Sequence, residues 1–182
     1  YAIERLRFRG SPYVGLGIYL AYLVPPSILL IPLATVIVQF GLFDSPLALI
    51  LVYPTFLVPF CTWLLIGYFK SIPYELEECA LVDGATRLQA FRAILPLVAP
   101  GIGAFVVLCI LFAWNDYLFA AIIGSGGAKT LPAATRELVQ PQNIQWGQIM
   151  AAGVVTTLPM MFLGLVIRKY LVTGLTMGAV KG

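Results

Sequence analysis

Long apolar stretches separated by short charged segments dominate this chain. Four stretches without a charged residue are long enough for membrane-spanning helices, which need about 20 apolar residues each. From their apolar parts we predict four transmembrane helices, at 14–40, 47–68, 97–123 and 149–170. The pattern therefore predicts an all-α fold, a polytopic transmembrane bundle that forms a single domain over residues 1–182.

The composition supports lipid as the solvent of this bundle. Hydrophobic residues make up 60% of the chain and charged residues only 10%, and the mean hydropathy is +0.95. A water-soluble domain of 182 residues cannot bury so much apolar surface in one core. Cys61 and Cys109 fall inside predicted spans and Cys79 in a loop, so we interpret all three as packing residues rather than a disulfide framework.

The positive charges indicate how the bundle is oriented. Nine of the eleven Lys and Arg residues fall on one side of the predicted spans, and only Lys129 and Arg136 fall on the other. Because basic residues are enriched in cytoplasmic loops, both termini and the loop 71–95 are predicted to be cytoplasmic, and the loop 124–148 periplasmic. The net charge of +3 then reports membrane topology and implies no nucleic-acid partner.

Prolines interrupt the predicted spans. Pro25, Pro26 and Pro32 should kink or break the first of them near its middle, since proline removes a backbone donor and disturbs the preceding turn. Inside a membrane such breaks are tolerated where protein or a water-lined cavity satisfies the freed carbonyl groups. Two interpretations stay open: a bundle around a translocation path, or ordinary kinks that improve helix packing.

The cytoplasmic loop 71–95 carries the most informative pattern. Gly84 after Asp83 is a natural helix stop, and Thr86 with Gln89 matches a capping box that starts another helix. We therefore predict two short helices that meet at Gly84. Most connections run about 4 to 6 residues, so this long loop favours a docking surface for a soluble partner. The alternative is an amphipathic segment on the membrane surface.

Two polar residues lie late in the third predicted span. Asn115 and Asp116 could line a translocation path, because ionisable residues inside a span are functional candidates by default. However, Trp114 and Tyr117 flank them as an interfacial aromatic belt would, and about 20 residues from Leu97 already cross the hydrocarbon. This second interpretation is slightly favoured, and both stay open.

The loop residues also carry a family resemblance. They resemble the EAA loop of ABC-importer permeases, whose pattern is Glu-Ala-Ala, three residues, Gly, nine residues, Ile, one residue, Leu-Pro; the matching positions are Glu78, Cys79, Ala80, Gly84, Ile94, Leu95 and Pro96. Cys79 replaces an alanine, and the spacing before Leu95 is one residue short. The segments 7–10, 114–116, 141–147 and 174–182 are also similar to the MalG-like permeases of the maltose/carbohydrate-uptake class.

This resemblance implies a fold of the ABC type I importer permease kind and a role in coupling. The positions expected to contact an ATPase are Glu78, Cys79, Ala80, Asp83, Gly84, Ala85, Leu88 and Phe91. The family also implies a second permease, two ATPase subunits and an extracytoplasmic solute-binding protein in a bacterial inner membrane. Members of the family usually carry two further spans before the segment 7–10, so we expect an N-terminal part of this chain to be missing.

Two further contacts rest on the resemblance. The outer loop is expected to touch the solute-binding protein through Gln140, Pro141, Gln142 and Asn143, with a polar cap over the bundle as the alternative. The C-terminal tail is expected to reach the ATPase through Lys181.

The predicted function is a permease subunit of an ATP-driven importer for a sugar, a disaccharide or oligosaccharide, with no catalytic, cofactor-binding or metal-binding residue of its own. ATP and Mg²⁺ would bind to the partner ATPases, since the chain has no Gly-x-x-x-x-Gly-Lys-Ser/Thr loop. One alternative is an ATP-independent secondary transporter or channel subunit, for which Asp116 would be the lone candidate for ion coupling. Another is a purely structural membrane subunit, which would not need the two-helix loop.

Overall fold

The computed structural model describes residues 1–6, 8–139 and 146–179, with the backbone alone from residue 166. Over these residues the chain is all-α, as predicted. A π-helical turn η1 precedes the α-helices, and their bounds are η1 Ala2–Leu6, α1 Ser11–Leu23, α2 Pro26–Gln39, α3 Pro46–Val52, α4 Pro54–Ser71, α5 Glu75–Val82, α6 Arg87–Asn115, α7 Leu118–Ile123, α8 Leu131–Glu137 and α9 Trp146–Ala179.

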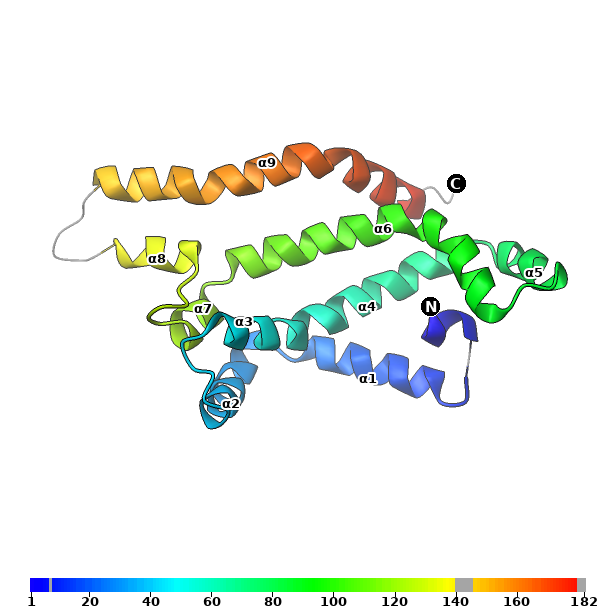
Figure 1. Cartoon of the computed structure of the whole chain (residues 1–182), viewed down its shortest axis with the longest axis horizontal. Helices are drawn as coiled ribbons and strands as arrows, with labels where there is room; N and C mark the ends of the chain where they lie inside the picture. Colours follow the sequence, from blue (N-terminus) through cyan, green and yellow to red (C-terminus); the bar gives the residue numbers. More distant parts are fainter. Residues whose placement is uncertain (7, 140–145, 180–182) are drawn as a thin grey trace.

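The helices α1, α4, α6 and α9 run side by side along the long axis of the molecule (Figure 1). α6 packs against both α4 and α9, and α4 packs against α1. The helix α5 and the start of the chain lie at one end of this bundle, whereas α2, α3, α7 and α8 lie at the other end (Figure 1). We call these the inner and the outer end, following the predicted orientation.

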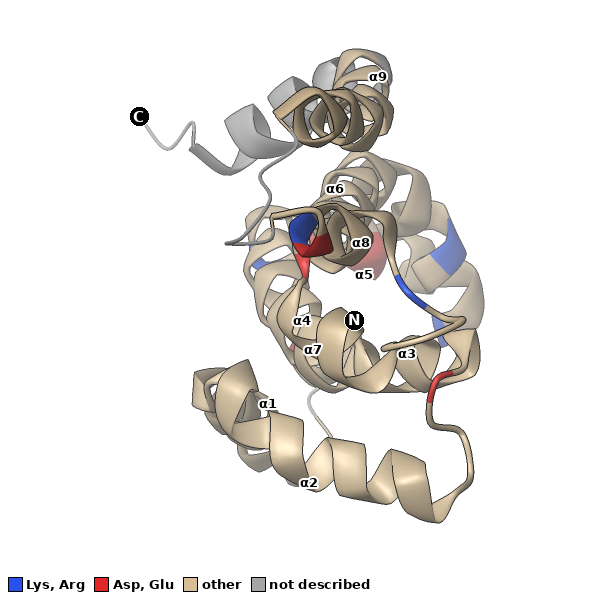
Figure 2. Cartoon of the chain, turned by 90° about the vertical axis from the view of Figure 1, so that its left-hand side faces the viewer, with Lys and Arg blue, Asp and Glu red and all other residues tan. Residues whose placement is uncertain are grey.

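In the described part of the chain, three helical stretches are long and apolar enough to cross a membrane: Pro46–Ser71, Arg87–Asn115 and Trp146–Leu165. The fourth candidate is the pair α1 and α2, which is bent by 95°. Figure 2 shows α2 lying across the outer end. α1 alone extends only about 20 Å at 1.5 Å per residue, less than the roughly 30 Å of a bilayer's hydrocarbon core.

The first predicted helix, 14–40, therefore consists of two. Val24 and Pro25 have extended backbones, and Pro26 begins α2 at its first position, where a missing N–H costs nothing. The break expected from the prolines is present, but Pro32 lies inside α2 without ending it. A single proline inside a helix can bend it without terminating it, and the predicted kink or break is met by the break at Pro25 and Pro26.

The third predicted helix differs at both ends. We predicted a separate loop helix followed by a span over 97–123, but α6 runs unbroken from Arg87 through Pro96 to Asn115. Asp116 then adopts an extended conformation, with φ −68° and ψ 123°. Its carboxylate accepts hydrogen bonds from the N–H groups of Phe119 and Ala120, which starts α7 in a new direction.

The buried residues form two clusters. The outer cluster joins α2, α3, α7 and α8 through Val52, Phe119 and Ile123, and the inner cluster joins the end of α4 to α6 through Phe69, Ile94 and neighbouring residues. α4 and α6 approach closely at Gly101, where an added Cβ would lie 2.6 Å from the Tyr68 ring. The fold thus has one packed centre at each end of the bundle.

Candidate functional site: the inner elbow and its anchor

The chain makes a sharp turn between α5 and the start of α6, and we call residues 75–91 the elbow. α5 carries Glu75, Glu77 and Glu78 in its first turn, where carboxylates favour the positive end of the helix dipole. Gly84 ends the helix with φ +85°, in the left-handed region that glycine enters most easily. The predicted stop at Gly84 is confirmed.

Backbone and side-chain caps fix the angle of the elbow. The N–H of Gly84 donates to the Leu81 carbonyl at 3.1 Å, and the N–H of Ala85 donates to the Ala80 carbonyl at 3.0 Å. This is the hydrogen-bond pattern of a Schellman motif. Two residues on, Thr86 and Gln89 form the predicted capping box at the start of α6. The chain therefore turns from one capped helix directly into the next.

The exposed side of the elbow carries both apolar and acidic side chains. Val82 is 86% exposed and Leu88 is 58% exposed; Glu78, Cys79 and Asp83 are exposed beside them. Large apolar side chains presented to water beside charges mark interaction surfaces. Val82 was not among our predicted contacts, although its place at the end of α5, next to Asp83, could have indicated it.

Phe91 faces inward instead. It is half-buried, and its ring lies 4.7 Å from the ring of Tyr1, centroid to centroid. Ala80 and Ala85 are also half-buried. The structure thus brings Glu78, Cys79, Asp83, Gly84 and Leu88 to the exposed face, and it places Phe91 among the residues that hold the elbow.

Glu77 joins the elbow to the start of the chain. Its side chain is only 6% exposed, and its Oε1 accepts a hydrogen bond from the Tyr1 hydroxyl at 2.5 Å. The Arg87 guanidinium lies 3.6 Å from the same oxygen. Burial, and then the hydrogen bond to Glu77, raise the pKa of the Tyr1 hydroxyl to about 12, so Tyr1 stays a donor to this carboxylate.

Arg5 holds the end of α4. Its side chain is buried, and Nη2 donates to the carbonyl oxygens of Phe69 at 2.7 Å and Ile72 at 2.5 Å. These carbonyls lie at the C-terminal end of the helix, which lacks intrahelical partners and attracts cations. The guanidinium also lies 4.0 Å from the centroid of the Tyr74 ring, and the Tyr74 hydroxyl donates to Glu4 at 3.0 Å.

We call Tyr1, Glu4, Arg5, Tyr74, Glu77 and Arg87 the anchor. It ties η1, the end of α4, α5 and the start of α6 into one unit. In the sequence, Arg5 and Arg87 indicated only the membrane topology, and the other anchor residues had no predicted role. No local pattern could have found them, because the partners lie up to 76 residues apart along the chain.

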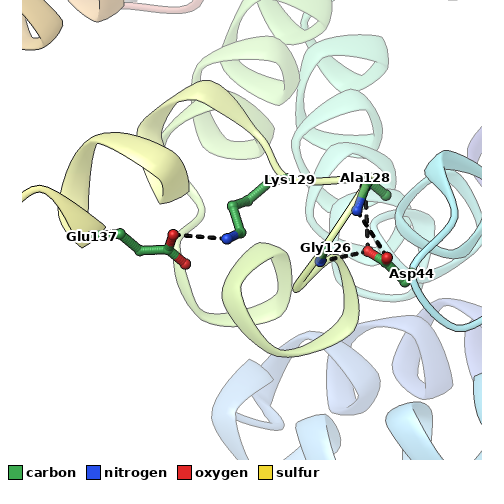
Figure 3. Close-up of polar contacts among 6 residues, drawn as sticks. Asp44, Gly126, Ala128, Lys129 and Glu137 are labelled. Carbon is green, nitrogen blue, oxygen red and sulfur yellow. Dashed lines mark hydrogen bonds and ion pairs between the residues drawn. The ribbon is translucent and has the colours of Figure 1, made fainter.

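The outer end is held by loop contacts (Figure 3). Asp44 accepts hydrogen bonds from the backbone N–H groups of Gly126 at 2.7 Å, Gly127 at 2.8 Å and Ala128 at 3.2 Å. Lys129 donates to Glu137 at 2.7 Å on the surface. These contacts fix the described part of the outer loop that leads into α8.

The two candidates at the end of α6 line a cavity of about 350 Å³. Asn115 is exposed, and its amide donates to the Leu111 carbonyl at 2.8 Å. Asp116 is half-buried and accepts a hydrogen bond from the Tyr53 hydroxyl at 3.3 Å. Asp116 thus has a structural part in starting α7 and also borders open space.

Two groups of predicted contacts lie outside the described residues. They are the outer-loop positions Gln140, Pro141, Gln142 and Asn143, and the tail residue Lys181. Among the residues that the structure does describe, no cluster of three or more His, Cys, Asp or Glu side chains could hold a metal ion.

Comparison with known proteins places the chain among transport components. Residues 5–177 match the family model described as "Binding-protein-dependent transport system inner membrane component". The whole chain is 39% identical to the inner membrane ABC transporter permease protein YcjP of Escherichia coli K12, over 66% of that protein. It is 40% identical to the trehalose transport system permease protein SugB of Mycobacterium tuberculosis, over 68% of its length.

A third relative is also named as a permease. The chain is 33% identical to the trehalose/maltose transport system permease protein MalG of Thermococcus litoralis, again over its full length and over 66% of the relative. The chain thus spans about two thirds of the length of the curated relatives that it matches.

Proposed function

The chain belongs to the family of binding-protein-dependent transport system inner membrane components, and from this premise we propose that it is the permease subunit of an ATP-driven sugar importer. Its similar relatives are named for permeases of trehalose, of trehalose and maltose, and of diacetylchitobiose. A disaccharide or oligosaccharide is therefore the proposed solute. The chain itself would carry out no covalent chemistry.

The exposed face of the elbow is the observation that carries this proposal. Val82, Leu88 and the acidic residues beside them offer a soluble partner both apolar contact and charge. The anchor buries the opposite side, so a push on α5 must move the ends of α4 and α6 with it. A surface that is exposed on one side and fixed on the other suits the transfer of a conformational change from an ATPase.

The same proposal assigns the remaining partners. A second permease would complete the translocation path, and two ATPase subunits would bind ATP and Mg²⁺ at the cytoplasmic side. A solute-binding protein outside would meet the loop that contains Gln140, Pro141, Gln142 and Asn143, and Lys181 would approach the ATPases. In this arrangement both termini of the described chain lie in the cytoplasm, in agreement with the distribution of Lys and Arg.

Copurification tests the coupling role. The full-length permease is purified from its native membrane with Val82→Asp, which places a charge in the exposed apolar face without touching the anchor. We expect the ATPase subunits to be lost from the complex. Val139→Asp is the matched control, since this valine is also exposed but lies at the outer end, and it should retain the ATPase.

Gly84→Pro provides a second, stronger variant. Proline cannot adopt φ +85° and would remove the N–H that bonds to the Leu81 carbonyl, so the elbow should lose its shape together with the ATPase. Retention of the ATPase in both Val82→Asp and Gly84→Pro would contradict the coupling role. Sugar uptake that continues without ATP would instead support a secondary transporter.

A further inference from the structure

A cavity at the outer part of the bundle opens where the chain breaks between α1 and α2. It is bordered by this break, by α4 and by the junction of α6 and α7, and its volume is about 350 Å³. This volume lies at the lower end of the range of about 300 to 1,000 Å³ that is usual for small-molecule sites. The cavity is thus large enough for one ring of a small polar solute.

The Asp116 carboxylate requires polar surroundings on its cavity side. Its Oδ2 accepts hydrogen bonds from the Tyr53 hydroxyl at 3.3 Å and from the N–H groups of Phe119 and Ala120 at 3.2 Å each. Its Oδ1 has no side-chain partner among the residues that the structure describes. Because a carboxylate that faces lipid is costly, water or a polar ligand in this cavity would stabilise Asp116.

The break between α1 and α2 is a second, independent reason to expect water or a polar ligand in this cavity. Pro25 and Pro26 have no N–H, so the carbonyl groups of Ala21 and Tyr22 lose the donors that would continue the helix, and the Ala21 carbonyl accepts from the Val24 N–H instead. Inside a membrane an interrupted helix is tolerated where protein buries it or where it lines a water-filled cavity. Val24 and Pro26 of the break border this cavity. In transporter folds, discontinuous helices of this kind form substrate sites.

Aromatic rings form most of the remaining wall. Phe60 lies 5.9 Å from Tyr22 and 5.1 Å from Phe112, measured between ring centroids, and all three border the cavity. Rings offer flat apolar faces, against which the C–H face of a sugar ring can pack. Asn115 and Asp116 at the edge supply the few polar groups that orient a ligand in an otherwise apolar pocket.

We propose that this cavity is a contact subsite for an uncharged sugar on the translocation path, with aromatic packing from Tyr22, Phe60 and Phe112 and a hydroxyl hydrogen bond to Asp116. The inference rests on the proposed function. The ligand is uncharged because no Lys or Arg is among the described residues that line the cavity, while the Asp116 carboxylate repels anions. The subsite discriminates against phosphorylated or acidic sugars.

Thiol labelling tests whether the cavity is wet. In the full-length transporter with Cys61, Cys79 and Cys109 replaced by Ala, Val24→Cys should react with a charged, membrane-impermeant methanethiosulfonate reagent, and trehalose or maltose should slow the reaction. Val58→Cys is the matched control. It lies on α4 two residues from both Phe56 and Phe60, on the opposite face of the helix, beside an apolar groove, and should stay unlabelled.

Transport kinetics test the sugar contact. Phe112→Leu should raise the KM for uptake of the neutral sugar about tenfold, a loss of binding rather than of turnover, while ATP hydrolysis stays responsive to the loaded binding protein. Asp116→Asn should also raise the KM for the neutral sugar. It should reduce the preference of the transporter for the neutral sugar over glucose 6-phosphate, because the repelling carboxylate is removed. Phe162→Leu on α9, an exposed ring that does not border this cavity, should leave the KM unchanged.

The outcomes separate this inference from the proposed function. An unlabelled Val24→Cys in a complex that transports trehalose or maltose would overturn the inference, since another segment would then fill the cavity. An unchanged KM in Phe112→Leu, or better protection by glucose 6-phosphate than by the neutral sugars, would also overturn it. By contrast, a wild-type complex that takes up none of these sugars, or does so without ATP, would count against the proposed function itself.

Discussion

The two ends of the bundle are held together in different ways. At the inner end, side chains that are far apart in sequence meet in buried contacts, and Arg5 and Glu77 are only 6% and 5% exposed. At the outer end, Asp44 binds backbone N–H groups of a glycine-containing turn at a partly exposed position, and Lys129 pairs with Glu137 on the surface.

This difference indicates how each end responds to force. A buried charge cannot leave its partners cheaply, because neither water nor another side chain is there to replace them. A surface carboxylate can exchange its partners for water at little cost. The inner end is therefore built to move as one piece, whereas the outer end can rearrange when a partner approaches.

Arg5→Met is expected to have the largest effect. It leaves the carbonyl groups of Phe69 and Ile72 without their donor, and we expect a loss of about 3 kcal/mol in the free energy of unfolding. The measurement is thermal or denaturant unfolding of the purified protein in detergent. Arg92→Met is the control, at an exposed position of α6, and should change the free energy of unfolding little. Equal losses of unfolding free energy in the two variants would contradict the conclusion that buried charges hold the inner end.

Glu77→Gln and Glu78→Gln compare neighbours on one helix. Glu77 is buried against Tyr1 and Arg87, whereas Glu78 is exposed. We expect Glu77→Gln to cost about 1 to 2 kcal/mol, since a charge-assisted contact is lost in a buried position. Glu78→Gln should stay within about 0.5 kcal/mol of the wild type in the same unfolding assay. If the two variants are equally stable, the anchor does not depend on the buried charge.

Asp44→Asn should have the smallest effect, and that effect should depend on pH. Hydrogen bonds from the N–H groups of Gly127, Gly126 and Ala128 lower the pKa of the Asp44 carboxyl below its ordinary value. Because the pKa of Asp44 is lower in the folded than in the unfolded protein, its ionised carboxylate stabilises the folded state fully at pH values above the unfolded pKa. This stabilisation is lost as the pH falls through the folded pKa.

The test compares unfolding midpoints of the wild type and Asp44→Asn. A small difference at neutral pH should shrink toward zero as the pH is lowered to about 2. A difference that stays constant over this range would show that the carboxylate charge does not hold the outer loop.

Local sequence signals predicted the elements whose causes are local. The stop at Gly84, the capping box of Thr86 with Gln89 and the break at Pro25 and Pro26 each depend on residues within one or two turns. For the same reason the elbow was found from its spacing alone. The exposed part of the candidate site followed from it, except for Val82.

Features that depend on tertiary contacts could not be predicted in this way. Hydropathy extended the third span to 123 because residues 118–123 are apolar, but the Asp116 carboxylate binds two N–H groups and ends the helix early. Likewise, the family resemblance placed Phe91 among the expected ATPase contacts, but its ring packs on Tyr1. Arg5 gave only a topological signal, because its partners lie 64 and 67 residues away.

The continuity of α6 has a mechanical consequence. Its 29 residues, with Pro96 and Pro100 among them, run without interruption from the elbow to Asn115, and the ribbon bends near its start (Figure 1). The part from Pro96 to Asn115 forms a lever about 30 Å long. If this lever pivots about its middle, a tilt of only about 5° shifts both of its tips by roughly 1.3 Å in opposite directions. Inward displacement at the inner end would then widen the outer end without any helix changing its length.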